Sequence, residues 1–201
     1  MDDTFLNDTW CLYFHDPDND DWGDDSYHAI CTMSTSEDFV NVHQLLQDGW
    51  SKGMFFIMRE HIRPQWEDEN NRYGGCFSFK IMKHEVSSYW FELGSKVLGE
   101  TMTSESHRHK WDKICGMSIS PKRSFCILRL WVSQQDYNDP AQYNFNAPPY
   151  TKIMFRPYSD NKDFNCLAEQ GTTWSRLMRR LDILVWAGSC CWGIFQRHCV
   201  G

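Results

Sequence analysis

Apolar and polar side chains alternate along residues 76–83, and this period of two fits a strand and excludes a helix. Phe77, Phe79 and Ile81 fall on one face of the segment, and polar side chains fall on the other. Such a strand covers a core with one face and leaves its second face accessible. The pattern therefore predicts a sheet that is packed against other elements on one side.

Six further segments are rich in β-branched and aromatic residues and are bounded by turn-forming residues, which is typical of strands. They are residues 10–14, 27–33, 54–58, 114–120, 125–132 and 152–158. A Pro-Lys-Arg-Ser segment at 121–124 predicts a tight turn between two of them. Residues 114–132 should therefore form an antiparallel pair within an antiparallel sheet.

Two amphipathic segments between the strands are predicted to be helices. A Ser-Thr-Ser-Glu capping box begins the first, with Ser34 as the cap and Glu37 bonding back to it, and this helix should end near Gln47. Ser87 is predicted to cap the second helix, which should end at Gly99. Both helices are expected to bury one apolar stripe against the sheet.

A third amphipathic stretch lies further along the chain, where Thr172 or Thr173 can cap a helix whose apolar face begins at Trp174. We expect this extra helical segment, about residues 172–201, to pack on the back of the sheet. The alternative is a helix that binds a membrane surface or a partner protein. Helices segregated along a sheet predict an α+β fold, and the length favours one domain over residues 1–201.

Two short polar segments each contain a tryptophan without apolar neighbours in sequence. Trp22 lies among acids and glycine, and Trp66 is followed directly by Glu67. Two indoles can stack on both faces of a flat cationic purine, such as one methylated on N7, and a carboxylate can accept hydrogen bonds from its edge. The alternative is a pair of surface turns whose acids are solvated.

The charge balance argues against a broad nucleic-acid surface. The formal net charge is −7, whereas general nucleic-acid binders neutralise many phosphates with basic side chains. Any contact with nucleic acid should therefore be local. Nine cysteines without paired spacing predict reduced thiols in an intracellular, cytoplasmic protein. The sequence shows no secretory signal, and its most apolar stretch, 181–195, is too interrupted to span a membrane.

Neither a cofactor nor a metal is predicted. Cys190, Cys191, His198 and Cys199 form a loose cluster, but their spacing does not match a zinc site. No glycine-rich cofactor loop follows a strand, and the acids around Trp22 fit a turn better than a magnesium site. The sequence therefore favours a binding protein over an enzyme.

One segment carries a specific resemblance. Residues 62–75 read Ile-Arg-Pro-Gln-Trp-Glu-Asp-Glu-Asn-Asn-Arg-Tyr-Gly-Gly and resemble the I-x-P-x-W-E-D stretch and double glycine of eukaryotic translation initiation factor 4E, a cap-binding family. Supporting matches are Trp-x-Leu-Tyr-Phe at 10–14, Ser-Glu-Asp-Phe at 36–39, Tyr89-Trp90, Leu-Gly-Glu at 98–100 and Cys115-Gly116 leading to Trp131. The resemblance covers roughly residues 10–158. It implies a curved sheet of about seven or eight strands, with about three helices on its convex back and a slot on its concave face.

The resemblance also implies a set of site residues for the 7-methylguanosine cap of mRNA. Trp22 and Trp66 match the stacking tryptophans, Glu67 matches the carboxylate that pairs with the guanine edge, and Trp131 matches a tryptophan that touches the N7-methyl group. The alternative for Trp131 is a strand residue that faces the core. Adenine would present the wrong hydrogen-bond pattern to Glu67.

The phosphate side departs from the family. Lys122 occupies a matching basic turn position, with Arg123 beside it, but the next lysine position falls on an isoleucine, for which Arg129 is the expected substitute. Cys76 stands where an arginine is common. Each cation has the alternative of being a solvated surface charge. A longer basic stretch at 107–113 is expected to be a solvated loop, with RNA contact as the alternative.

Two positions concern a protein partner. The family binds a scaffold of the factor 4G type through a tryptophan after Glu-Asp-Phe, but this chain has Val40 there, while Phe91 keeps an apolar group nearby. We therefore expect altered docking or a divergent partner, since valine buries less area and donates no N–H. The alternatives are a cap-binding repressor that does not recruit the scaffold and, more remotely, a cap-processing enzyme.

Overall fold

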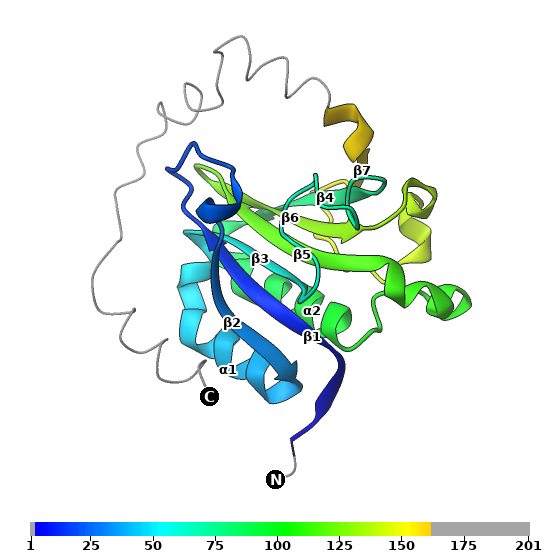
Figure 1. Cartoon of the computed structure of the whole chain (residues 1–201), viewed down its shortest axis with the longest axis horizontal. Coiled ribbons are helices and arrows are strands. Elements are labelled where there is room, and N and C mark those ends of the chain that lie inside the picture. Colours follow the sequence, from blue (N-terminus) through cyan, green and yellow to red (C-terminus); the bar gives the residue numbers. More distant parts are fainter. Residues whose placement is uncertain (1–2, 162–201) are drawn as a thin grey trace.

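The structure, a computed structural model, describes residues 3–161. Seven strands form one sheet in the order β2-β1-β3-β5-β6-β4-β7, and every neighbouring pair is antiparallel. The strands are β1 (Phe5–His15), β2 (His28–Thr35), β3 (Met54–Arg59), β4 (Gly75–Met82), β5 (Ile114–Pro121), β6 (Phe125–Val132) and β7 (Met154–Pro157). All seven predicted strands are confirmed, and the fold is the expected curved α+β sheet (Figure 1).

The helices α1 (Ser36–Leu46) and α2 (Val86–Leu98) lie on the convex face of this sheet (Figure 1). The predicted cap of α1 was wrong by one residue. Thr35, not Ser34, caps the helix, because its hydroxyl accepts a hydrogen bond from the backbone N–H of Asp38 (3.1 Å) and Asp38 accepts one from the N–H of Thr35 (2.9 Å). The carboxylate of Glu37 instead accepts a hydrogen bond from the N–H of Thr4 (3.0 Å).

The second helix ends at Gly99, as predicted, but begins differently. No side chain caps α2, because a short 3₁₀ helix (Lys83–Glu85) leads directly into it. The hydroxyl of Ser87 lies 3.2 Å from Nε2 of His43 on α1. Ser87 thus links the two helices and does not begin one.

The main hydrophobic core fills the space between the helices and the convex face. Phe77, Phe79 and Ile81 of β4 belong to it, so the alternation predicted for this strand is confirmed. Trp10, Trp50, Trp90, Leu12, Ile57, Met117, Leu128 and Leu130 are among its fully buried members. A second, smaller cluster lies on the opposite, concave face and consists of Met54, Phe56, Met58, Ile62, Cys76, Cys115, Trp131 and Tyr158. Both faces therefore carry apolar groups, and within residues 3–161 α-helices cover the convex face alone.

Two glycines bring the strands at one edge into close contact. A Cβ atom added at Gly74 would collide with the backbone of Val132 and Ser133, and one at Gly75 would collide with the backbone of Arg156 and Pro157. Side chains are excluded here because the neighbouring strands pass too close. The double glycine therefore allows the loop that precedes β4 to pack closely against the sheet.

Several expectations concern segments outside the strands. The basic stretch at 107–113 is not a loop but part of a 3₁₀ helix (Glu105–Lys113), none of whose residues is buried. The predicted third helix and the segment 172–201 lie outside the described residues, as does the Cys190–Cys199 cluster. Within residues 3–161, no helix is both long enough and apolar enough to cross a membrane.

Candidate cap-binding site

The two tryptophan segments, far apart in sequence, lie side by side at one end of the sheet. Trp22 is in the loop between β1 and β2, and Trp66 is in the loop between β3 and β4. The side-chain amide of Gln65 donates a hydrogen bond to the carbonyl of Trp22 (3.2 Å). The guanidinium of Arg63 bonds the carboxylate of Asp24 (2.6 Å). The fold thus joins the two segments that carry the candidate aromatic groups.

The loop that carries Trp66 is held from within by two buried polar side chains. The carboxylate of Asp68 accepts hydrogen bonds from the N–H and side-chain amide of Asn70 (both 2.9 Å) and from the N–H of Arg63 (3.2 Å). Burial alone would raise the pKa of Asp68, but these bonds outweigh it and lower that pKa. The amide of Asn71 donates to the carbonyls of Arg63 (3.0 Å) and Gln65 (2.8 Å). Trp66 and Glu67 are therefore presented by a fixed frame.

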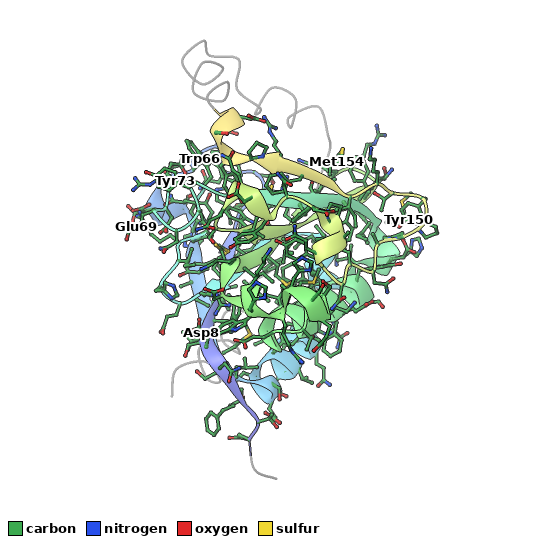
Figure 2. All side chains as sticks on the ribbon, turned by 90° about the vertical axis from the view of Figure 1, so that its right-hand side faces the viewer. Asp8, Trp66, Glu69, Tyr73, Tyr150 and Met154 are labelled. Carbon is green, nitrogen blue, oxygen red and sulfur yellow. The ribbon has the colours of Figure 1, made fainter. Side chains whose placement is uncertain are left out.

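The two indoles differ in their surroundings. The side chain of Trp66 packs against the concave cluster and is half-buried. The indole of Trp22 is 49 % exposed and stacks on the imidazole of His15, with ring centroids 4.1 Å apart and an angle of 13° between planes. Figure 2 shows Trp66 with Tyr73 and Glu69 at one upper edge of the molecule, well away from Tyr150.

Glu67 directly follows Trp66, and the residue is exposed. Neighbouring protein still removes part of the water around its carboxylate, which raises its pKa above the ordinary value; the negative charge of Asp24 adds to this effect while Arg63 opposes it. Burial also raises the pKa of Tyr27, and the charges of Glu67 and Asp24 raise it further. Glu67 therefore interacts electrostatically with Asp24 and Tyr27, which belong to the other loop. A cationic ligand at this point would relieve the cost of holding Glu67 ionised.

Trp131 faces the concave side, so the alternative that it faces the main core was wrong. Its neighbours Leu130 and Val132 point into the main core, and period-two geometry turns Trp131 the other way. Its indole N–H donates to the hydroxyl of Ser118 (2.9 Å), and its ring packs against that of Tyr158 (5.3 Å between centroids). The tryptophan is 7 % exposed, so it offers only a small edge to a ligand.

Two of the three predicted cations interact electrostatically. Burial lowers the pKa of Lys122, and the positive charge of Arg129 lowers it further. Arg129 lies on the same face as Trp131, as predicted, and its guanidinium donates to the hydroxyl of Ser120 (2.8 Å). Arg123 is exposed at the tip of the turn, and no described contact joins it to either. Adjacent cations of this kind favour an anionic ligand.

Comparison with known proteins identifies the architecture. Residues 5–162 match the sequence model of the family described as eukaryotic initiation factor 4E. The chain belongs to this family. It is 28 % identical over 135 residues to eukaryotic translation initiation factor 4E of Eremothecium gossypii, covering 63 % of this chain and 61 % of that protein. It is 26 % identical over 170 residues to the factor of Aplysia californica, covering 77 % and 76 %.

Solved structures of the family share the fold. Factor 4E-3 of Caenorhabditis elegans, in complex with the 4E-binding protein Mextli and a cap analogue, has a TM-score of 0.67 and 20 % identity, covering 81 % of this chain and 96 % of that one. Factor 4E-3 of Ascaris suum, in complex with an m7G cap, has a TM-score of 0.58 and 24 % identity, covering 69 % and 78 %. The matched region spans only about three fifths of the Eremothecium factor 4E (61 %).

One cation of this factor 4E chain escaped the sequence-based prediction. Arg156 on β7 is exposed and is the register partner of Cys76, which in turn pairs with Trp131 on β6. Burial raises the pKa of the Cys76 thiol, while the charges of Arg129 and Arg156 lower it, so both guanidinium groups lie near Cys76. The strand at 152–158 was predicted, but its register against β4 was not accessible from sequence.

The candidate partner residues of this factor 4E chain lie on the helices, on the opposite side of the sheet from Trp131. Val40 on α1 is half-buried. The ring of Phe91 on α2 stacks parallel to that of Phe39, with centroids 5.5 Å apart and planes 8° apart. Leu45 on α1 is 49 % exposed. Phe91 therefore joins the two helices, and Leu45 leaves apolar area accessible on α1.

Proposed function

We propose that this chain binds the 7-methylguanosine 5′ cap of mRNA and acts in translation initiation. The observation that carries the proposal is the pairing of the two tryptophan loops, with Glu67 directly after Trp66 in one of them. The purine would stack between Trp22 and Trp66. Glu67 would accept hydrogen bonds from N1–H and N2–H of guanine, and Trp131 would lie at the N7-methyl group. The solved complex of the Ascaris relative with an m7G cap supports the class of ligand.

Charge recognition follows from the aromatic groups. Methylation on N7 gives guanine a positive charge, and an indole face attracts a cation through its quadrupole. Unmethylated guanine keeps the same shape and hydrogen-bond edge but lacks the charge. The proposed slot should therefore prefer methylated to unmethylated guanine nucleotides.

The decisive experiment is a titration of tryptophan fluorescence with 7-methyl-GTP and with GTP. We expect clear preference for the methylated nucleotide, and Trp22→Ala or Trp66→Ala should each weaken binding by about 5- to 150-fold, because one base stack contributes about 1–3 kcal/mol. Phe5→Ala is the matched control, since Phe5 is an exposed aromatic (77 %) at the other end of β1. Equal affinity for the two nucleotides would refute the proposal.

The triphosphate would be held by Lys122, Arg129 and Arg156, with Arg123 at the margin. We expect Arg129→Ala and Arg156→Ala each to weaken 7-methyl-GTP binding by about 3- to 10-fold in low salt, since charge-assisted hydrogen bonds contribute about 1.5–3 kcal/mol and solvent screens part of this. Binding of 7-methylguanosine itself should not change. Arg108→Ala on the distant 3₁₀ helix is the control. Equal losses for nucleoside and nucleotide would exclude a phosphate role.

The helix side would bind a scaffold of the factor 4G type, divergent from the ordinary one. Relatives solved with 4E-binding proteins support a partner of this class. We expect an ordinary 4G peptide to bind weakly and Val40→Trp to strengthen binding by at least about 10-fold, because an indole adds buried area and an N–H donor. Asn41→Trp, at the exposed neighbouring position, is the control. Strong binding of that peptide by the unmodified chain would contradict the proposal.

The second candidate is a repressor that binds the cap without recruiting a scaffold. Val40 in place of the family's tryptophan is compatible with an initiation factor that has a divergent partner and with such a repressor. A cap-dependent reporter separates them: an initiation factor raises its translation, and a repressor lowers it. An enzymatic role receives no support from family membership, since members of the initiation factor 4E family are binding factors.

A further inference from the structure

Trp22 has one indole face covered before any ligand arrives. The imidazole of His15 lies nearly parallel to it, at 4.1 Å and 13°, while the indole remains 49 % exposed. The residues on either side of Trp22, from Asp20 to Asp25, are all exposed and offer it no packing partner. The ring of Tyr27 lies further away, with centroids 6.4 Å apart and planes 58° apart, so His15 makes the closest described ring contact of this indole.

His15 is itself held firmly. It is the last residue of β1, is fully buried, and pairs in register with Met54 of β3. Its Nε2 lies 2.9 Å from the carbonyl of Asp21, the residue before Trp22. The ring of Tyr27 packs edge-on against it, with centroids 5.1 Å apart and planes 61° apart. The sheet thus fixes the imidazole, and the imidazole fixes both the backbone and the ring of the Trp22 segment.

The hydrogen bond of His15 also fixes which edge of its ring faces the Trp22 segment. A carbonyl oxygen only accepts hydrogen bonds, so Nε2 carries the proton in the bond to Asp21. Nδ1 is buried and has no hydrogen-bond partner within residues 3–161. The bond to Asp21 holds the imidazole against the Trp22 segment, so the ring covers one face of the indole and leaves the other face accessible.

We propose that His15 is a positioning residue of the cap slot, which aligns Trp22 through stacking and leaves one indole face for the ligand. The inference rests on the proposed function, in which that ligand is a 7-methylated guanine. His15 does not touch the ligand in this arrangement. It acts only through Trp22, so the effect of replacing His15 on ligand affinity should depend on whether Trp22 is present.

The experiment is a double-mutant cycle with 7-methyl-GTP. His15→Ala should weaken binding by about 3- to 10-fold, as expected for the loss of one aromatic pair, and His15→Phe should retain binding within about twofold because it keeps the stack. In a Trp22→Ala background, His15→Ala should have no further effect. An equal loss in both backgrounds, or unchanged binding in a folded His15→Ala protein, would overturn the inference.

A second measurement does not depend on the ligand. Acrylamide quenching of Trp22 is obtained as the difference between each protein and its Trp22→Phe counterpart. His15→Ala should make Trp22 more accessible to the quencher, and His15→Phe should not. If the unmodified chain shows no preference for 7-methyl-GTP, the proposed function fails. The quenching measurement then still tests whether His15 orders the indole of Trp22. Unaltered quenching in the His15→Ala protein would reject the positioning role.

Discussion

Replacing Glu67 with glutamine should lower the affinity for 7-methyl-GTP by about 100-fold or more. The carboxylate would accept two charge-assisted hydrogen bonds from the guanine edge, and each contributes about 1.5–3 kcal/mol. Glutamine keeps one acceptor but places an N–H₂ donor against a guanine donor. It also removes the negative charge that faces the methylated base. Isothermal calorimetry with 7-methyl-GTP measures the loss.

Glu69 supplies a matched control for this substitution. It carries the same charge two residues further along the loop, is exposed like Glu67, and lies at the outer edge of the molecule in Figure 2. Glu69→Gln changes the net charge by the same amount as Glu67→Gln, so it reports any general electrostatic effect. Comparable losses in the two variants would show that Glu67 has no specific contact with the base.

The raised pKa of Glu67 adds a dependence on pH. Only the ionised carboxylate can accept both hydrogen bonds. The affinity for 7-methyl-GTP should therefore be highest at pH values above the pKa of Glu67 and should fall as the pH drops through that pKa. Because the pKa lies above the ordinary value, the decline should begin at a higher pH than for an ordinary glutamate. In the Glu67→Gln protein, this acid-side decline should disappear. A decline of the same size in both proteins would assign it to another group.

The layout of the sheet was predictable because alternation is a property of the sequence itself. The positions of Phe77 and Phe79 decide which face of β4 meets the helices, and the spacing of Arg129 and Trp131 decides that they share a face. The tryptophan loops were predictable for a different reason. An indole among acids and glycine cannot be buried by its own segment, so it indicates a partner elsewhere.

Features that depend on register or on competition between neighbours were not predictable. Thr35 and Ser34 are both good caps, and the choice between them depends on how β2 enters α1. Arg156 lies beside Cys76 only because β7 pairs with β4 in one register out of several. The sequence places His15 at the end of a strand. Its stacking on Trp22 could not be predicted, because it depends on the path of the loop between the two residues.

The largest effect on stability is expected at Gly74. Gly74→Ala should reduce the free energy of unfolding by about 3 kcal/mol or more, because the added Cβ would collide with the backbone carbonyl of Val132. Val132 lies in β6, which is paired on both sides, so its backbone cannot move without breaking one of two strand pairings. Urea denaturation followed by circular dichroism measures the change.

Gly49→Ala is the control for this prediction, since a Cβ there meets Leu46 at 3.7 Å, an ordinary contact, and the change should stay within about 1 kcal/mol. The Gly74 substitution should also weaken cap binding beyond its effect on stability. The backbone N–H of Gly74 donates a hydrogen bond to the carbonyl of Asn71 in the Trp66 loop (2.8 Å), and its carbonyl accepts one from the N–H of Tyr158 beside Trp131 (3.0 Å). A shift at Gly74 should therefore displace both the Trp66 loop and the residues around Trp131. If Gly74→Ala matched Gly49→Ala in stability, close backbone contact could not be the reason for glycine at this position, and the loop would need another anchor.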